Sequence, residues 1–454
     1  MTERVREWAP WSGRVEDCGL PVIGRSDVLV VGAGAAGVAA ATVVGEAGGS
    51  VTVVEGYGFA GGAAVAGMSG TICGLFLASH ETEASAPVVN GFAGRFVDEL
   101  LRRDGLTEPQ RYGKTFTRAH DPLKWRESAD HFLVRAGVKV LFHTTVVGVL
   151  HSDHGYAGVV VASKAGVGVL LADRFIDASG DAALVAHGGG DYRFGDDGRV
   201  QNPTMFFRLG EVDEELFWSA WGADTISPDW VSNAITRSHA ATGALPRSRI
   251  WVFRTGRPRE LLVNATRLVG AGGRQLNVID PDDFTEAEIG GRRQVRAYAR
   301  FFAENLPGCE RSYVVDTGVE AGVRQTRTIA GIETLRNEDV VLARKRQDSI
   351  CRSPWPIEVH DGERPRLHWI LDDYYDVPYG ALVPDRGENI IVAGRCLSAD
   401  HEALASARVT AQCFEYGHAA GVATLISLEE TTAYRYIAPE LVRREMIRHG
   451  SELA

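Results

Sequence analysis

The sequence predicts an α/β fold in which a domain built from β–α–β units is split by an inserted α+β domain. A β-branched apolar run at 27–31 (DVLVV) leads through a glycine-rich turn into an alanine-rich stretch. A second apolar run at 50–54 (SVTVV) completes the β–α–β unit. A buried-strand pattern then returns at 389–393 (NIIVA), ahead of a long small-residue helix pattern, as expected when an insertion separates two parts of one domain.

Length and composition limit the possible functions. The 454 residues allow two or three domains, and 45% hydrophobic with 24% charged residues is typical of a globular protein. A net charge of −11 argues against nucleic acid or an anionic membrane as partner. The first 25 residues lack a signal-peptide core, and no apolar run reaches the ~18 residues that span a bilayer. The six cysteines form neither a C-x-x-C pair nor a zinc pattern, so we expect a cytoplasmic protein without a metal site.

The elements follow in four segments. Residues 1–25, which contain Pro10, Pro21 and Gly24, are expected to form an irregular N-terminal arm. Residues 26–189 form the first part of the β–α–β domain, with predicted strands at 27–31, 50–54, 138–142, 145–151, 157–163, 168–171 and 175–178, and helices at 38–46, 93–103 and 122–136.

The later segments have weaker patterns. Residues 190–375 are predicted to be the inserted domain, with strands near 204–209 and 250–254 and helices near 214–221 and 287–304. Residues 376–454 close the first domain with the strand at 389–393, a helix at 408–426 and further C-terminal helices.

The turn after the first strand has the sequence Gly-Ala-Gly-Ala-Ala-Gly, typical of a dinucleotide-binding site. Gly32 allows the turn, Gly34 allows the backbone to approach a pyrophosphate, and Gly37 allows close packing of helix on strand. The amides that open the helix attract phosphate, and Glu55 at the tip of the second strand can accept hydrogen bonds from a ribose. The alternative is a glycine-rich turn in some other α/β domain. The expected dinucleotide contacts here are Gly32, Gly34, Ala35, Ala36, Gly37 and Glu55.

NAD and FAD both fit this unit, and two features favour FAD. Gly61 and Gly62 lie in a small-residue loop after Glu55, where a pyrophosphate and ribityl chain could pass close to the backbone. The returning strand with Gly394, followed by the 408–426 helix, can close the domain over the isoalloxazine.

Several segments resemble the family of FAD-dependent oxidoreductases with a glutathione-reductase-like flavin domain. They are 27–55, Gly61-Gly62, 175–181 (FIDASGD), 318–326 (GVEAGVRQT), 355–360 (WPIEVH), 377–384 (VPYGALVP) and 392–406 (VAGRCLSADHEALAS). The resemblance covers most of residues 20–430, and the last segment is the most specific. It implies a Rossmann-type flavin domain, one tightly bound FAD and redox chemistry, but no particular substrate.

Further cofactor contacts are expected near the ends of the later strands. Many flavin enzymes place an aspartate after the glycine of the late strand, whereas this chain has Arg395, which suits a phosphate oxygen better. Asp177 and Asp181 flank Ser179-Gly180, and a carboxylate there could instead cap the next helix. Given the family resemblance, proximity to the dinucleotide is favoured, mainly through Gly180 and Asp181. The remaining expected cofactor contacts are Val146, Gly394 and Ala407.

Candidate catalytic residues are His401, His360 and Tyr379. His401 precedes the late helix and has the pKa of a base at neutral pH, or else it caps that helix. His360 comes from the inserted domain and faces substrate unless it is satisfied within that domain. Tyr379 covers the flavin ring or simply packs.

Four other side chains have a functional and a plain alternative. Cys73 and His80 follow the Gly61-Gly62 loop and could hold a covalent flavin bond, which we consider the minor alternative. Arg324 and Arg327 either bind an anionic group or are surface charges, the safer interpretation.

The function expected is removal of a hydride from a CH–OH or CH–NH carbon of a small polar metabolite, with molecular oxygen or another acceptor reoxidising FAD. The chain has one dinucleotide fingerprint, and it lacks the Gly-Asp-Ala-Ala-His and Asp-Gly motifs of aromatic hydroxylases. A flavin monooxygenase using NAD(P)H and oxygen is therefore the second hypothesis. A non-redox protein that holds FAD as structure is the third.

Overall fold

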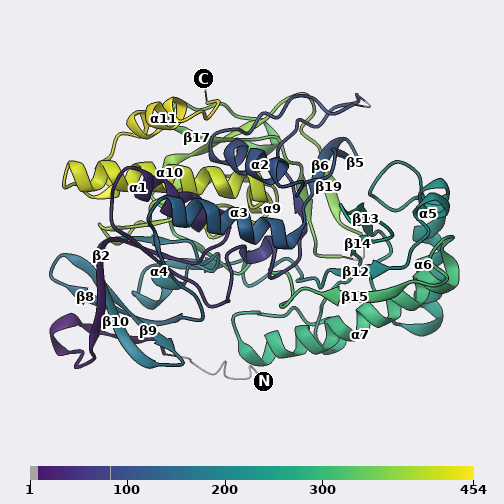
Figure 1. Ribbon diagram of the computed structural model, residues 1–454, viewed down its shortest axis with the longest axis horizontal. Helices are drawn as coiled ribbons and strands as arrows, with labels where there is room; N and C mark the ends of the chain where they lie inside the picture. Colours follow the sequence, from purple (N-terminus) through teal and green to yellow (C-terminus); the bar gives the residue numbers. More distant parts are fainter. Residues whose placement is uncertain (1–8, 82, 363, 454) are drawn as a thin grey trace.

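The computed structural model describes residues 9–81, 83–362 and 364–453 (Figure 1). The first eight residues of the predicted N-terminal arm lie outside this range. The rest of the arm is not wholly irregular, because β1 (Trp11–Arg14) pairs with β8 (Thr145–Ser152) at the edge of the main sheet.

The predicted mixed α/β fold is confirmed by a main sheet with a parallel centre. Its parallel strands are β7 (Lys139–Leu141), β3 (Val51–Val54), β2 (Val22–Val31), β10 (Gly166–Asp177) and β21 (Ile390–Val392). The first half of β10 pairs antiparallel with β9 (Gly155–Ser163), which pairs antiparallel with β8. The strands predicted at 168–171 and 175–178 are thus parts of one long strand.

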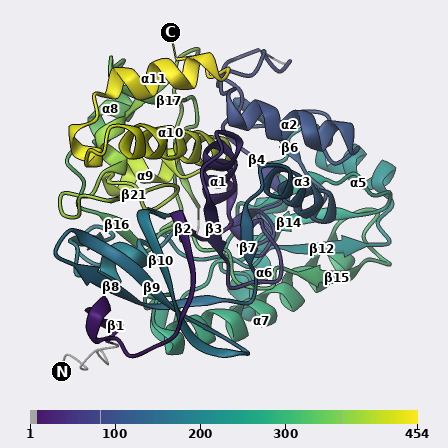
Figure 2. The same ribbon diagram turned by 60° about the vertical axis from the view of Figure 1, so that its left-hand side comes forward.

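Two helices beside this sheet pack closely against each other. α1 (Ala35–Glu46) lies alongside α10 (Thr410–Glu429) in Figures 1 and 2. A Cβ on Gly417 would lie 2.1 Å from the carbonyl oxygen of Ala36, and one on Gly421 would lie 2.9 Å from Cβ of Val43. These glycines therefore let the two backbones approach. α2 (Phe92–Arg102) and α3 (Pro122–Arg135) complete this layer.

A second hydrophobic core surrounds an antiparallel sheet, on the right of Figure 1, and we call this sheet with its helices the second unit. Its strands follow the order β13 (Trp251–Arg254), β14 (Leu261–Asn264), β12 (Phe207–Gly210) and β15 (Tyr313–Thr317). Its helices are α5 (Glu214–Trp221), α6 (Asp229–Thr242) and α7 (Pro281–Asn305).

The second core takes its buried residues from between Met205 and Ala321. Later residues of the predicted 190–375 domain, such as Leu335, Ile350 and Tyr375, are buried in the first core. The paired strands β17 (Ser349–Ser353) and β20 (Tyr375–Pro378) pack there. The remaining elements are β4 (Thr71–Ile72), β5 (Gln110–Tyr112), β6 (Thr115–Ala119), α4 (Ala183–His187), β11 (Tyr192–Phe194), β16 (Arg327–Ile329), α8 (Asn337–Val341), β18 (Ile357–Val359), β19 (Arg366–His368), α9 (His401–Ala407) and α11 (Pro439–Arg448).

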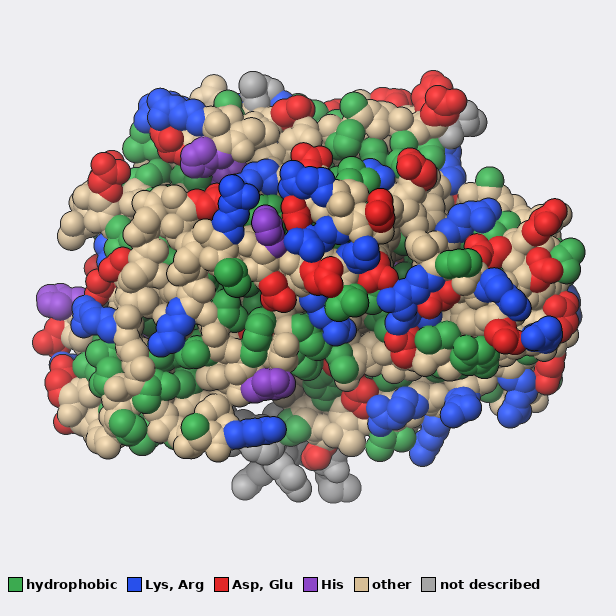
Figure 3. Space-filling model, viewed as in Figure 1, with side chains coloured by type: hydrophobic (Ala, Val, Ile, Leu, Met, Phe, Trp, Pro, Cys, Tyr) green, Lys and Arg blue, Asp and Glu red, His purple; other side chains and the backbone are tan. Residues whose placement is uncertain are grey.

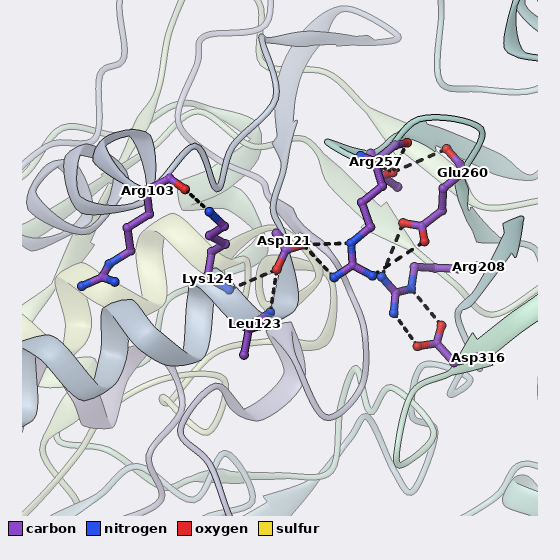
Figure 4. A network of polar contacts seen from close by, with 9 residues as sticks. Arg103, Asp121, Leu123, Lys124, Arg208, Arg257, Glu260 and Asp316 are labelled. Carbon is purple, nitrogen blue, oxygen red and sulfur yellow. Dashed lines mark hydrogen bonds and ion pairs between the residues drawn. The ribbon is translucent and has the colours of Figure 1, made fainter.

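A polar network joins the two cores (Figure 4). Asp121 caps α3 by accepting hydrogen bonds from the amides of Leu123 and Lys124, at 2.8 and 3.1 Å. Its second oxygen accepts two hydrogen bonds from Arg257 of the second unit, at 3.0 and 2.8 Å. The start of α3 is therefore tied to the second unit.

The surface carries both charge signs. Acidic and basic side chains are intermingled on the face shown in Figure 3. Among the described residues, no helix is both long enough and apolar enough to cross a bilayer.

Candidate active site

A single cavity, with about 500 Å³ of space, runs from the start of α1 to the second core. At one end it is lined by the ends of β2 and β3 and by the residues that follow β10, and at the other by residues of β14 and β18. Twelve of the expected cofactor residues line it: Gly32, Gly34, Ala35, Ala36, Glu55, Gly61, Gly62, Val146, Gly180, Asp181, Gly394 and Arg395. Gly37 and Ala407 do not line it and are buried behind its wall.

The first end is a cradle made of backbone. Gly34 is the N-cap of α1, and no described side chain caps that helix, so its first amides are open to a ligand. A Cβ on Gly62 would lie 3.0 Å from Cα of Gly34, so side chains here would fill the gap between the two loops. A Cβ on Gly37 would lie 1.9 Å from the Gly32 carbonyl oxygen, which explains the close contact of helix and turn. The cradle therefore fits a diphosphate, which helix N-termini attract.

Glu55 lies at the tip of β3 beside this cradle and is 8% exposed. Its carboxylate accepts hydrogen bonds from the amides of Ala33, at 2.7 Å, and Tyr57, at 2.9 Å. Burial raises the pKa of Glu55, and these backbone donors partly oppose the rise. Because each carboxylate oxygen has two lone pairs, the side chain is fixed in place and can still accept bonds from ribose hydroxyls.

Arg395 and Asp181 form an ion pair in the wall of the cavity. The guanidinium donates to Oδ1 of Asp181 at 2.7 Å, and the same oxygen accepts from the Thr326 hydroxyl at 2.6 Å. Arg395 crosses over Gly180, where a Cβ would lie 2.9 Å from the guanidinium carbon. Its Nε is buried without a hydrogen-bond partner among the described residues, so a donor is left for a cofactor oxygen.

Asp177 has a different role from its neighbour Asp181. Its side chain is fully buried and accepts hydrogen bonds from the amides of Leu184 and Val185 at the start of α4, at 2.8 and 3.3 Å. It also accepts from the Ser179 hydroxyl at 2.6 Å. Asp177 therefore caps α4, which was the alternative interpretation for a carboxylate in this segment.

The other end of the cavity holds a buried polar cluster of Tyr112, Glu358 and His360. Oε1 of Glu358 accepts a hydrogen bond from the Tyr112 hydroxyl at 2.6 Å and lies 3.2 Å from Nε2 of His360. Nδ1 of His360 lies 3.0 Å from a guanidinium nitrogen of Arg247. Because arginine only donates, Nδ1 is the acceptor and Nε2 carries the proton, a tautomer assigned from these partners.

The charges in this cluster follow from its surroundings. Burial would raise the pKa of Glu358, but contact with His360, the Tyr112 hydroxyl and Arg408 lowers it to about 2. Burial, together with the nearby Arg324 charge, holds the pKa of His360 well below its usual value. Burial also raises the pKa of the Tyr112 hydroxyl. At neutral pH the cluster thus contains an ionised carboxylate, a neutral imidazole and a protonated phenol.

Two of the three predicted catalytic residues lie elsewhere. His401 is the first residue of α9 and lines a separate hollow with Asp196, Arg199 and Glu402. Tyr379 is buried in the first core, where its hydroxyl donates to the carbonyl oxygen of Tyr434 at 3.0 Å. Of the three, only His360 lines the cavity.

The remaining candidate residues also lie in different surroundings, some in the cavity wall and others outside it. Arg324 is not a surface charge, since it is 7% exposed and lines the cavity, whereas Arg327 donates to the Asp181 carbonyl oxygen at 2.9 Å. Cys73 lines the cavity as a thiol whose pKa burial raises to about 11, and His80 is exposed. The sequence patterns did not identify Tyr112, Arg247, Glu358 and Arg408 as site residues. Of these four, only Glu358 lies in a segment that the sequence singled out, WPIEVH.

Comparisons with known proteins were made for the whole chain. Residues 27–446 match a family model described as FAD dependent oxidoreductase. No curated protein matches significantly.

Several solved structures are similar. A geranylgeranyl bacteriochlorophyll reductase-like protein from Thermoplasma acidophilum has 14% identity and a TM-score of 0.48, over 94% of this chain and 84% of that chain. A p-nitrophenol 4-monooxygenase from Pseudomonas putida DLL-E4 has 11% identity and a TM-score of 0.48, over 94% and 90%. A flavoprotein/dehydrogenase from Cytophaga hutchinsonii has 13% identity and a TM-score of 0.48, over 93% and 83%.

Proposed function

Because the chain belongs to the family of FAD-dependent oxidoreductases, we propose that it oxidises a small metabolite at a carbon that bears a hydroxyl or amino group. One observation carries the proposal. A single cavity connects a diphosphate cradle to the buried carboxylate of Glu358, whose Oε2 accepts no hydrogen bond from the described residues.

The first end of the cavity holds the cofactor. The amides that open α1 bind the diphosphate, and the Arg395 guanidinium donates to a further cofactor oxygen through its free Nε. Glu55, fixed by its two backbone donors, accepts the ribose hydroxyls of the adenosine. When bound, FAD supplies a two-electron acceptor for the hydride of the substrate.

The proton of the substrate's O–H or N–H goes to Glu358. Among the described residues, only Tyr112 and His360 donate to this carboxylate, and both face Oε1. Oε2 is thus left for the substrate. A base must lie within hydrogen-bond reach of the proton it removes, and the position of Glu358 in the cavity wall supports this role.

His360 then positions the base and is not the base itself. Its Nδ1 lone pair already accepts from Arg247, and its Nε2–H donates to Glu358. The imidazole therefore fixes the orientation of the carboxylate and stabilises its charge until the substrate proton arrives.

The proposal includes a glutathione-reductase-like flavin domain. The parallel order β7–β3–β2–β10–β21 with the antiparallel extension β8–β9–β10 supports it. We place the substrate domain around the second core, between Met205 and Ala321.

Anaerobic spectroscopy tests the proposed reaction. The FAD-loaded protein is mixed without oxygen with separate hydroxy and amino metabolites, and the flavin absorbance is followed. We expect bleaching by at least one of these metabolites but not by NADPH. Bleaching by NADPH alone, followed by oxygen incorporation into a metabolite, contradicts the proposal and identifies a monooxygenase. A flavin that neither kind of donor reduces indicates a structural cofactor and also contradicts it.

A matched pair of variants tests the assigned base. Glu358→Gln keeps the shape and hydrogen bonding of the side chain but cannot take a proton, so bleaching by the same metabolite should slow about 100-fold or more. Glu304→Gln, an exposed change on α7, is the control and should leave the rate unchanged. Equal rates in the two variants contradict the role of Glu358.

A further inference from the structure

We propose that the substrate of this site carries a carboxylate, and that Arg324 and Arg408 bind it. The inference rests on the proposed function and specifies the substrate class of the same cavity. It starts from three arginines, Arg247, Arg324 and Arg408, each of which is close enough to Glu358 to feel its charge, and two of which line the same cavity.

Arg324 and Arg408 line the cavity, and their own partners are neutral. Arg324 donates to the carbonyl oxygen of Asn202 at 2.7 Å, and Arg408 donates to the side-chain oxygen of Gln201 at 3.0 Å. Within the described part of the chain neither forms an ion pair, and Nε of Arg408 is buried without any acceptor. Each guanidinium therefore has donors left for a ligand.

Arg247 lies behind them and is 2% exposed. It donates to Oδ1 of Asn264 at 2.9 Å and to Nδ1 of His360 at 3.0 Å, which are again neutral partners. Among the described residues, Glu358 is the one carboxylate that acts on these three guanidiniums, so positive charge exceeds negative charge in this end of the cavity.

Such an excess is costly in a buried site unless an anion compensates it. Burial lowers the pKa of Arg324 well below its usual value, and repulsion from Arg247 and Arg408 adds to this shift. Two other cations lie nearby, and the first, Arg395, already forms an ion pair with Asp181. Arg267 donates to the backbone oxygen of Asp361 and does not line the cavity.

The compensating anion is distinct from the cofactor's diphosphate. That group has its own cradle at the start of α1, at the other end of the cavity, beside Gly34 and Gly62. A carboxylate also matches the planar fork of guanidinium, which binds it with two parallel hydrogen bonds.

The walls around the arginines indicate the rest of the ligand. Phe206, Phe253 and Trp355 line the cavity and are nearly fully buried. Together with Tyr112 they offer an aromatic surface to the body of the substrate. The site therefore fits an acid with a compact apolar or aromatic body, whose hydroxyl or amino group faces Glu358.

Calorimetry with non-reacting probes tests this without turnover. The FAD-loaded protein is titrated with phenylacetate, with its neutral analogue phenylacetamide, and with phenyl phosphate. We expect phenylacetate to bind at least tenfold more tightly than the amide. Equal affinity of these two overturns the inference, and tighter binding of phenyl phosphate than of phenylacetate overturns the choice of a carboxylate.

Variants locate the binding groups. Arg324→Gln and Arg408→Gln should each weaken phenylacetate binding at least tenfold, with bound FAD confirmed by absorbance. Arg311→Gln, at a side chain 74% exposed in the second unit, is the matched control and should bind as the wild type does. If the two cavity variants fail to fold, the phenylacetate and phenylacetamide comparison in the wild type still decides.

The result is separable from the proposed reaction. Arginine-dependent binding of phenylacetate by a protein whose flavin no metabolite reduces supports the anion site and refutes the oxidoreductase mechanism. Reduction by neutral alcohols or amines, with no preference for phenylacetate over its amide, supports the mechanism and refutes the anion site.

Discussion

Replacing Gly417 by alanine tests whether the contact of α10 with α1 holds the cofactor cradle in place. The new Cβ would lie 2.1 Å from the Ala36 carbonyl oxygen and 2.8 Å from Cα of Ala36, whereas real contacts stay above 3.0 Å. Both neighbours are backbone, so the helices must move apart by close to 1 Å. Ala36 lies in the first turn of α1 and lines the cavity, so the amides that we propose to bind diphosphate move with it.

The expected magnitude comes from two opposing effects. Overpacking of this kind costs about 1–3 kcal/mol, whereas alanine in place of glycine inside a helix stabilises by up to about 1 kcal/mol. We therefore expect Gly417→Ala to lower the free energy of unfolding by about 1–2 kcal/mol and to weaken FAD binding.

The matched control is Gly290→Ala in α7, where a Cβ meets nothing within 4 Å. This change should stabilise the protein by up to about 1 kcal/mol and leave FAD binding unaltered. Urea unfolding of the FAD-free protein and fluorescence titration with FAD measure both quantities. If Gly417→Ala stabilises the protein as the control does and binds FAD like the wild type, the reasoning is refuted.

Three other predictions follow from the site and from the network that joins the two cores. Glu55→Gln removes a charge-assisted acceptor worth about 1.5–3 kcal/mol, so FAD affinity measured by fluorescence should fall roughly 10- to 100-fold; unchanged affinity contradicts the ribose contact. Tyr112→Phe leaves Oε1 of Glu358 with one donor fewer, which raises the pKa of that carboxyl; flavin bleaching should therefore lose rate at a higher pH on acidification than in the wild type, and an unshifted profile contradicts the cluster. Asp121→Ala removes a helix cap worth about 1 kcal/mol. Burial would raise the pKa of Asp121, but hydrogen bonding to the Lys124 amide and the ion pair with Arg257 lower it overall. The ionised Asp121 side chain therefore stabilises the fold above its unfolded-state pKa, and this stabilisation is lost as pH falls below about 4. Urea unfolding should therefore show a smaller loss on acidification in the variant than in the wild type, and equal losses contradict this.

The cofactor end of the cavity was predictable because its signal is local. The predicted strand at 27–31 lies within β2, the one predicted at 50–54 contains β3, and the glycine pattern lies between them in the chain. The sequence pattern implies that side chains would not fit at these glycines, and a Cβ on Gly32 or Gly37 would indeed collide with backbone atoms. The predicted helix at 214–221 likewise agrees with α5, whose start Asp213 caps by accepting from the Leu216 amide at 3.2 Å.

Strand β10 was harder to predict, because its polar residues are paired with residues far away in the sequence. Asp173 and Arg174 interrupt the apolar pattern in the middle of β10, so the sequence predicted two strands. In the fold Asp173 pairs with Arg25 at 2.8 Å, and Arg174 donates to the Ser427 hydroxyl at 2.6 Å. Polar side chains with such partners fit inside a strand that their residue types alone would end.

The substrate end could not be predicted for the same reason. Its groups come from positions 112, 247, 324, 358 and 408, and no spacing in the chain relates them. His401 was predicted to lie near the flavin, at the start of the late helix. In the structure this region forms two helices, α9 and α10, with a break at Arg408. His401 lines a separate hollow, whereas Arg408 lines the cavity. The predicted single helix at 408–426 could not reveal this.

A crystal structure of the FAD-loaded protein tests the central claim most directly. We predict diphosphate oxygens within hydrogen-bond distance of the Ala35 and Ala36 amides, with the adenosine ribose at Glu55. A diphosphate bound away from the start of α1, or a ribose without contact to Glu55, would contradict the account.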